Sequence, residues 1–225
     1  MDKSDLQELL FTLYLRLNGY FVTGFIVHAA AGNTTELDAL AVRFPFHNES
    51  EREVVPCEQL RVPKDKIDFL ICEVKGGNKS ANFNNAFRSN KNAVMSVLNR
   101  FGAFKEDAVS QLADEIIDAI KPERINKTNK IPVVGVADGG SQIRCILVAP
   151  DQSRSNGKEK PYIYGDDIVA YIWKCFRPEN IREACGVIYN WNLWGEQYQQ
   201  LVEYFKDRNL TSSGGVDDIY KHFGL

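Results

Sequence analysis

Cysteine is sparse in this sequence, and its placement excludes two common classes of small protein. The five cysteines are spread over 225 residues and form no CxxC pair, so neither a zinc cluster nor a disulfide framework is expected. Long apolar runs are also missing, since no stretch approaches the roughly eighteen uninterrupted apolar residues of a membrane-spanning helix. The first five residues include two acids, unlike the basic start of a signal peptide. We therefore expect a reduced, cytoplasmic protein with no part in a membrane.

An excess of charge of one sign is absent as well. The 27 lysines and arginines against 30 acidic residues give a formal net charge of −3 and a pI near 5.7. A general polyanion-binding protein is strongly basic, so any contact with nucleic acid must come from a local patch. The chain is 44% hydrophobic and 25% charged, as in an average globular protein, which excludes a largely disordered or fibrous one.

The spacing of apolar residues predicts alternating helices and strands. Leucines three and four residues apart indicate a helix over 4–17, with Ser4 as its N-cap and Asn18-Gly19 as its stop. The further predicted helices cover about 80–99 (capped by Ser80 or Asn82), 106–120, 166–176 and 195–207. The predicted strands cover 20–31, 36–44, 67–75, 131–137, 142–149 and 162–164. The polar stretch 151–160 is a predicted loop, and the polar, glycine-rich stretch 207–218 is expected to be mobile. Asp138-Gly139-Gly140 predicts a hairpin turn, and the whole order is typical of an α/β sandwich around a mixed sheet.

Charged residues stand in pairs at the ends of two predicted strands. Glu36 and Asp38 are two residues apart on one strand, and Glu73 and Lys75 are two apart on the next, so each pair shares a face. If the two strands are antiparallel neighbours, all four side chains converge at one rim of the sheet. Three carboxylates that meet there repel one another unless a cation joins them, and their oxygens suit Mg²⁺ or Mn²⁺. A lysine beside such a metal can orient a water; a salt-bridged strand end in an unrelated α/β protein is the alternative explanation.

This pattern resembles the PD-(D/E)XK nuclease superfamily, which includes restriction endonucleases and archaeal Holliday-junction resolvases. The matching residues are Asp38 on the second predicted strand and Glu73-Val74-Lys75 at the end of the third. The helix Leu6–Leu17 and the following Asn18-Gly19-Tyr20-Phe21-Val22 look like the family's first helix and the start of its first strand.

The resemblance implies a restriction-endonuclease-like αβββαβ core, with a mixed central sheet flanked by helices, over residues 1–150. Residues 151–225 would then form a C-terminal helical extension packed on that core. Two features depart from the family pattern: Leu37 stands in place of a proline, and the 34 residues between the matched acids require an insertion at about 45–66. The implied activity is Mg²⁺-dependent (or Mn²⁺-dependent) hydrolysis of phosphodiester bonds in DNA, in restriction, phage defence or repair.

The resemblance also assigns roles to single residues. The residues that it implies for catalysis are Asp38, Glu73, Lys75 and Glu36, of which Lys75 would handle the attacking water. The residues that it implies for the metal are Asp38, Glu73, Val74 through its carbonyl, and Glu8, which matches an acid of the family's first helix.

Charge is unevenly distributed along the chain, although the total is close to zero. Six basic residues and no acid lie within 74–105, directly after the candidate metal site. Lys79, Arg88 and Lys91 are therefore expected to contact a phosphate backbone, joined by amide side chains such as Asn84. A solvated helix face is the alternative explanation of the same residues.

Two functions remain open from the sequence. The first is the metal-dependent nuclease, and the second is a catalytically silent nucleic-acid-binding or assembly subunit with the same fold. DNA is the expected partner, RNA is an open alternative, and either a homodimer or a partner subunit is compatible with the sequence.

Overall fold

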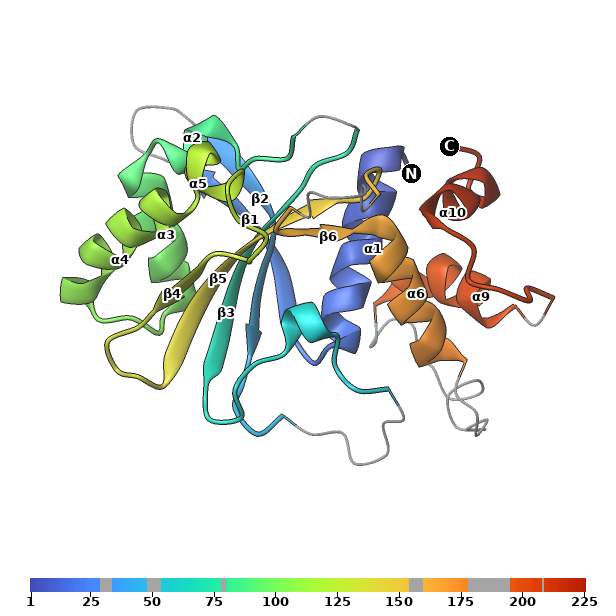
Figure 1. Ribbon diagram of the computed structural model, residues 1–225, viewed down its shortest axis with the longest axis horizontal. Coiled ribbons are helices and arrows are strands. Elements are labelled where there is room, and N and C mark those ends of the chain that lie inside the picture. Colours follow the sequence, from blue (N-terminus) through green and yellow to red (C-terminus); the bar gives the residue numbers. More distant parts are fainter. Residues whose placement is uncertain (29–33, 48–53, 78–79, 154–159, 178–194, 208) are drawn as a thin grey trace.

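The chain folds into an α/β structure in which a mixed six-stranded sheet lies between two layers of helices (Figure 1). The computed structural model describes residues 1–28, 34–47, 54–77, 80–153, 160–177, 195–207 and 209–225. The α/β class and the mixed sheet flanked by helices, both expected from the sequence, are confirmed. None of the described helices combines the length and the apolar character needed to cross a membrane.

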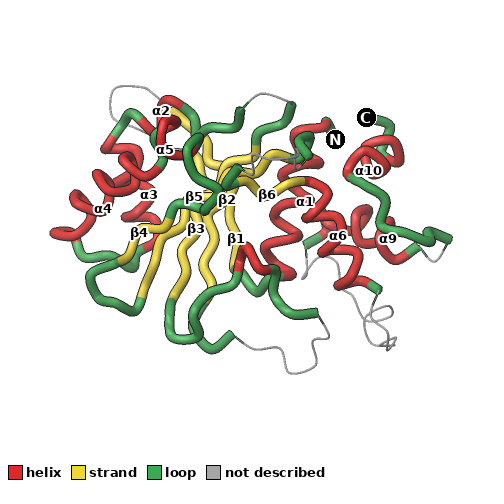
Figure 2. The backbone as a smooth tube through the Cα atoms, in the orientation of Figure 1, coloured by secondary structure: helices red, strands yellow, loops and turns green. Residues whose placement is uncertain are grey.

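The strands gather in one sheet between the helices (Figure 2). The sheet begins as an antiparallel meander and continues through parallel pairing. Its strands are β1 (Phe21–His28), β2 (Thr34–Arg43), β3 (Ile67–Val74), β4 (Val133–Gly135), β5 (Ser141–Ala149) and β6 (Tyr162–Tyr164). The order is β1-β2-β3-β5-β4, and β6 also pairs with β5. β2 pairs antiparallel with β3, which meets the condition for the charged side chains of the two strands to converge. The predicted β4–β5 hairpin is confirmed, although β4 is shorter than its predicted range.

The first helix, α1 (Lys3–Leu17), ends where the sequence predicts but begins earlier. Its N-cap is Asp2 and not Ser4, because Asp2 and Asp5 accept hydrogen bonds from each other's backbone N–H in a capping box. Gly19, just beyond the helix, has a φ of +86°, which a residue without a side chain adopts readily. A Cβ there would also lie 2.3 Å from His47 Nε2, so only glycine lets the loop after β2 pack against the helix end.

Four helices connect β3 to β4 and cover one face of the sheet. They are α2 (Asn85–Arg88), α3 (Lys91–Phe101), α4 (Glu106–Ala119) and α5 (Pro122–Ile125). The single helix predicted over about 80–99 is therefore wrong, because the chain breaks at Ser89-Asn90 and starts again. The Asn90 side chain accepts hydrogen bonds from the N–H groups of Asn92 and Ala93, so neither Ser80 nor Asn82 is the cap. A short polar side chain at this position competes with the helix for backbone donors.

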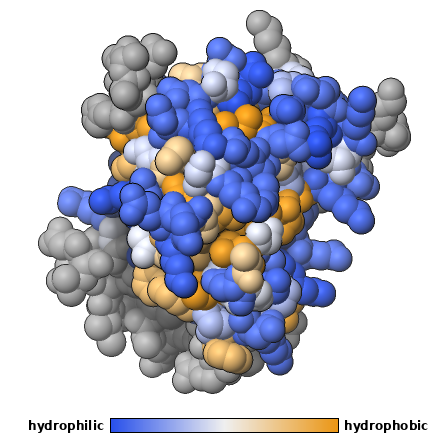
Figure 3. Space-filling view, turned by 90° about the vertical axis from the view of Figure 1, so that its left-hand side faces the viewer, coloured by the Kyte–Doolittle hydropathy of each residue, from blue (hydrophilic) through white to orange (hydrophobic). Residues whose placement is uncertain are grey.

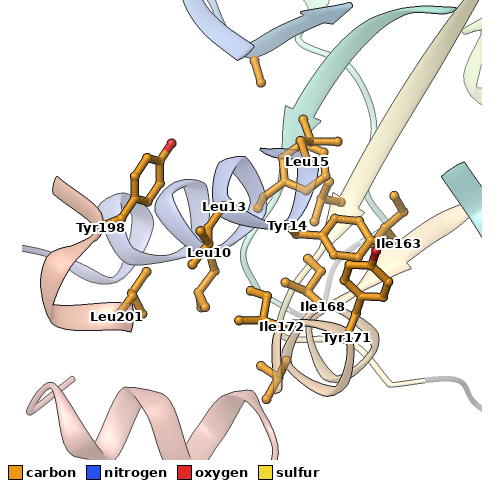
Figure 4. Close-up of a cluster of buried hydrophobic side chains, with 14 of the residues drawn as sticks. Leu10, Leu13, Tyr14, Leu15, Ile163, Ile168, Tyr171, Ile172, Tyr198 and Leu201 are labelled. Atoms are coloured by element: carbon orange, nitrogen blue, oxygen red, sulfur yellow. The ribbon is translucent and has the colours of Figure 1, made fainter. Parts of the chain in front are cut away.

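The other face of the sheet is covered by α1 and by the C-terminal helices, which share one apolar cluster (Figure 4). These helices are α6 (Gly165–Phe176), α9 (Gln199–Lys206) and α10 (Val216–His222). The short 3₁₀ turn η2 (Glu196–Tyr198) directly precedes α9, and a second one, η1 (Glu58–Leu60), lies between β2 and β3. Leu10 and Tyr14 of α1 lie among Ile163 of β6, Ile172 of α6 and Leu201 of α9 in this cluster. The C-terminal segment therefore contributes both to the sheet and to the core around the first helix.

The helix α10 begins within the polar, glycine-rich stretch 207–218, where the sequence predicted no helix. Asp218 accepts a hydrogen bond from Gly215 N at the start of α10, and Val216, Ile219 and Tyr220 are buried. Val216, Ile219, Tyr220 and Phe223 have the i, i+3, i+4, i+7 spacing of an amphipathic helix. The polar, glycine-rich residues before them obscured this short signal, and the neighbouring helices supply the surface that buries the apolar side chains.

A buried ion pair anchors the beginning of β3. Asp68 is fully buried and binds Arg144 of β5, with the Arg144 Nε 2.9 Å from one carboxylate oxygen. Tyr20 and Gln142 donate further hydrogen bonds to the same carboxylate, at 2.6 and 2.8 Å. Because each Asp68 oxygen has donors and Arg144 also reaches the Gln59 carbonyl, this buried charge is fully satisfied.

Candidate active site

The Glu73 and Lys75 side chains meet at the end of β3. The Glu73 side chain is only 1% exposed, and its Oε1 accepts a hydrogen bond from Lys75 Nζ at 2.5 Å. Lys75 Nζ also donates to Asn84 Oδ1 at 2.9 Å, while 33% of the lysine side chain stays exposed. The acid is therefore held inside the protein, and the lysine that binds it is open to solvent on one side.

The second carboxylate oxygen of Glu73 is left without a donor. Among the described residues, Glu73 Oε2 is buried and has no hydrogen-bond partner. Burial raises the pKa of Glu73 to about 7, because the Lys75 hydrogen bond only partly offsets it and the negative charge of Asp38 adds to it. An unpartnered buried carboxylate oxygen costs free energy, so this atom needs either a proton or a cation.

Asp38 of β2 lies near Glu73 and Lys75, next to a β-bulge in the pairing of β1 with β2. Thr23 pairs with Leu40 and Phe25 with Leu37, so the single residue Gly24 lies opposite both Asp38 and Ala39. Such a bulge changes the direction of side chains and often lies beside active sites.

Glu36 and Asp38 were predicted to share a face because side chains alternate between the two faces of a regular strand. The bulge interrupts this alternation. Leu37 and Leu40 are three residues apart and yet belong to the same core cluster. The position of Asp38 is instead fixed by a contact, because its Oδ2 accepts a hydrogen bond from Val74 N at 2.5 Å. Burial raises the pKa of Asp38, and the Val74 N–H and Lys75 partly offset this rise.

Glu8 and Glu36 contribute negative charge to the same region. Burial raises the pKa of Glu8, and the charges of Asp38 and Glu36 raise it further. Glu8 lies on α1, whereas Glu36 is an exposed residue of β2. The structure thus brings the helix acid and the strand acids within electrostatic reach of one another.

The carboxylates of the candidate site provide oxygen ligands of the kind that a hard divalent cation prefers, but they are fewer than a complete ligand set. Within the described residues, no three His, Cys, Asp or Glu side chains form a group that could hold a metal as they stand. Mg²⁺, however, is often held by one or two carboxylates together with waters and substrate phosphates. The unpartnered Glu73 Oε2 beside Asp38 offers that smaller set.

The residues predicted to bind nucleic acid have different surroundings. Lys79 lies outside the described residues. Lys91 Nζ forms an ion pair with Asp114 Oδ2 of α4 at 2.6 Å, and Arg88 is half-buried, with a buried Nε that has no partner among the described residues. Figure 3 views the side of the molecule on which α3 and α4 lie, where hydrophilic side chains dominate and apolar ones show between them.

Two residues near the site, Asn84 and Asp151, make contacts that the sequence did not predict. Asn84, predicted as a phosphate contact, binds Lys75 instead. Asp151 was given no role, yet its Oδ2 accepts a hydrogen bond from Gly77 N at 2.6 Å, and Gln7 of α1 donates to its Oδ1 at 3.0 Å. Asp151 thereby ties the turn after Lys75 to the first helix. Its distance of more than seventy residues along the chain gave no local signal.

Comparisons with protein-family models, curated proteins and solved structures found no match. The function is therefore inferred from the chemistry of the site.

Proposed function

We propose that this protein is a metal-dependent endonuclease that hydrolyses phosphodiester bonds of DNA and uses Mg²⁺ or Mn²⁺. The observation that carries the proposal is the buried Glu73 Oε2, which has no donor among the described residues and lies on the carboxylate that binds Lys75. A purely structural ion pair would satisfy both oxygens, as the Asp68 pair does.

The order of the elements supports a restriction-endonuclease-like αβββαβ core. One helix precedes the β1–β2–β3 meander, and the crossover helices then lead to β5, which pairs in parallel with β3. In this proposal β6, α6, α9 and α10 form the C-terminal extension, packed on α1.

Asp38 and Glu73 would hold the metal, with the Val74 carbonyl and Glu8 as further ligands and Glu36 in a supporting role. When bound, the metal would supply positive charge that offsets the charge of the phosphate and lowers the pKa of a water. The hydrogen bond from Val74 N fixes one Asp38 oxygen toward β3. The raised pKa values of Glu8, Asp38 and Glu73 indicate a site where a positive charge is favoured.

Lys75 would position the attacking water. Among the described residues, Glu73 and Asn84 accept two of the hydrogen bonds that its ammonium group can donate. An ammonium group has three donors, so one stays available for a water or a phosphate oxygen. Because Lys75 is partly exposed, a substrate can approach it from solvent.

Nicking of supercoiled plasmid, with Mg²⁺ or Mn²⁺ against EDTA, tests the proposal. We expect cleavage that requires the metal, loss of cleavage in Glu73→Gln and Lys75→Met, and wild-type cleavage in a Lys127→Ala control at an exposed position far along the chain. Absence of cleavage of any DNA or RNA form, together with no metal binding in calorimetry, would rule the proposal out.

One observation favours the alternative, a catalytically silent nucleic-acid-binding or assembly subunit. It is the absence of a ready group of three metal-binding side chains among the described residues. The alternative predicts binding of DNA in EDTA that metal neither strengthens nor converts into cleavage.

A further inference from the structure

A cavity lies at the end of the sheet away from Lys75. It has a volume of about 330 Å³ and lies between the segment that follows β2 and the segment that precedes β3. Arg43 ends β2, whereas Glu73 is near the end of the antiparallel strand β3. Seven residue steps lead from Lys66, just before β3, to Glu73, which corresponds to about 23 Å of extended strand. The cavity is therefore distinct from the candidate active site.

Exposed aromatic rings gather at this cavity. Phe44 and Phe46 line it and are 53% and 78% exposed. Phe21, 68% exposed, contacts Phe44 edge-on with ring centroids 6.0 Å apart. Large aromatic side chains are normally buried, and a cluster of exposed ones marks a binding surface.

The backbone holds Phe46 in this exposed position at a conformational cost. Its φ is +60°, and no other non-glycine residue in the described part of the chain has a positive φ. Phe46 N donates a hydrogen bond to the Lys64 carbonyl at 3.1 Å, which fixes the turn. Strained conformations of bulky residues are typical of functional sites, and here the strain places the ring in solvent.

The charged residues that line the cavity are all basic, although the exposed Asp65 lies between two of them in the sequence. Arg43, Lys64 and Lys66 line the cavity, and the described lining residues include no acid. A ligand that suits both the rings and the cations carries flat aromatic groups and negative charges in alternation. Nucleotides of a single strand have this chemistry, because every base presents a π-face and every linkage carries a phosphate.

We propose that this cavity binds single-stranded nucleic acid, with a base stacked on Phe46 and Phe44 and phosphates near Arg43, Lys64 and Lys66. A base paired inside a duplex cannot stack in this way, so the site selects an unpaired end, flap or loop. The binding does not depend on the proposed cleavage, since it needs neither Glu73 nor a metal.

The test is fluorescence anisotropy with a labelled oligothymidylate of about twelve nucleotides in EDTA, where cleavage cannot occur. Phe46→Ala should raise the Kd about 5- to 150-fold, the range expected for one stacked base. Because Phe46 is exposed, its replacement should leave the circular dichroism spectrum and the melting temperature unchanged.

A charge-matched pair of variants tests the phosphate contacts. Lys64→Ala/Lys66→Ala should lower the slope of log K against log salt by about 1.4, because each single-strand phosphate contributes about 0.7. The control Lys127→Ala/Lys130→Ala removes the same charge from exposed residues outside the cavity and should change the slope much less.

Failure of this proposal is distinguishable from failure of the proposed function. Wild-type protein that does not bind the oligonucleotide, an unchanged Kd for Phe46→Ala, or equal slopes for the two lysine pairs would each overturn the cavity assignment. Plasmid nicking would be unaffected by that outcome. Conversely, Glu73→Gln should bind the oligonucleotide like the wild type even if no cleavage is ever observed.

Discussion

Asp38 Oδ2 accepts a hydrogen bond from Val74 N at 2.5 Å, so the carboxylate of β2 is attached to the backbone between Glu73 and Lys75. The contact crosses from one strand to its antiparallel neighbour beside a β-bulge. This hydrogen bond holds Asp38 beside Glu73. The alternation of side chains along the two strands would not by itself fix that position.

Asp38→Asn and Asp38→Ala should both abolish cleavage but differ in stability. Asparagine keeps an oxygen for the Val74 N–H and removes a charge that Glu36 and Glu73 repel, so its melting temperature in EDTA should equal or exceed that of the wild type. Alanine leaves the N–H without its partner, which should cost about 1 kcal/mol. Thermal unfolding of the three proteins in EDTA measures the difference, and equal destabilisation by both substitutions would contradict the contact.

Addition of Mg²⁺ or Mn²⁺ should raise the melting temperature of the wild type, since a ligand that binds only the folded state stabilises it. Glu73→Gln should lose most of this shift, because the carboxylate with the unpartnered oxygen is gone. Lys127→Ala serves as a control and should keep the full shift. The same metal-dependent shift in Glu73→Gln and wild type would show that the metal binds elsewhere.

The stability of the metal-free protein should fall as the pH rises from 4.5 to 7. Burial raises the pKa of Glu73 from its ordinary value of 4.5 to about 7, so the folded state holds this proton more tightly than the unfolded state. The stabilisation is complete below 4.5 and is lost as the pH passes through 7. Denaturant unfolding in EDTA across this range should show a steeper fall for the wild type than for Glu73→Gln, and parallel curves would argue against the raised pKa.

Asn84→Ala should lower turnover about tenfold to a hundredfold with little effect on DNA affinity, because Asn84 positions the Lys75 ammonium. Asn85→Ala is the matched control, since Asn85 is the exposed first residue of α2 and directly follows the N-cap Asn84. Single-turnover rates and binding isotherms separate the two effects. A loss of affinity equal to the loss of rate would instead place Asn84 on the DNA, as first predicted.

Lys91→Ala should lower the slope of log K against log salt for DNA binding by less than about 0.9, the value expected for one phosphate contact. The reason is that Lys91 is already paired with Asp114. Asp114→Asn should release the lysine and strengthen DNA binding, whereas Asp107→Asn on the same helix should not. Binding titrations across salt concentrations decide this. If Asp114→Asn has no effect, the α3–α4 side does not contact DNA.

The sequence alone determined the α/β class, the order of most elements and the two strands that carry Asp38 and Glu73, although β2 starts at Thr34 and Asp38 lies within the strand and not at its end. These features depend on local signals: leucine spacing predicts α1, apolar runs predict the strands, and glycines and amides mark their ends. The wrong predictions concern where helices begin and end, because packing against neighbouring elements decides those boundaries. Asn90 starts a new helix inside a continuous apolar stripe, and α10 forms because α6 and α9 bury its few apolar residues.

Only the tertiary structure decided which acid of β3 has donors for both carboxylate oxygens. Asp68 and Glu73 are both buried acids of one strand. The nearby Lys75 marks Glu73 in the sequence, but nothing local predicts that Asp68 is fully hydrogen-bonded and that Glu73 is not. Asp68 has Arg144, Tyr20 and Gln142 as partners, all distant along the chain, whereas one oxygen of Glu73 has none among the described residues. The difference arises because the energy of a buried charge depends on the donors that folding brings within about 3 Å, and those donors are fixed by strand register and helix packing rather than by neighbouring residues.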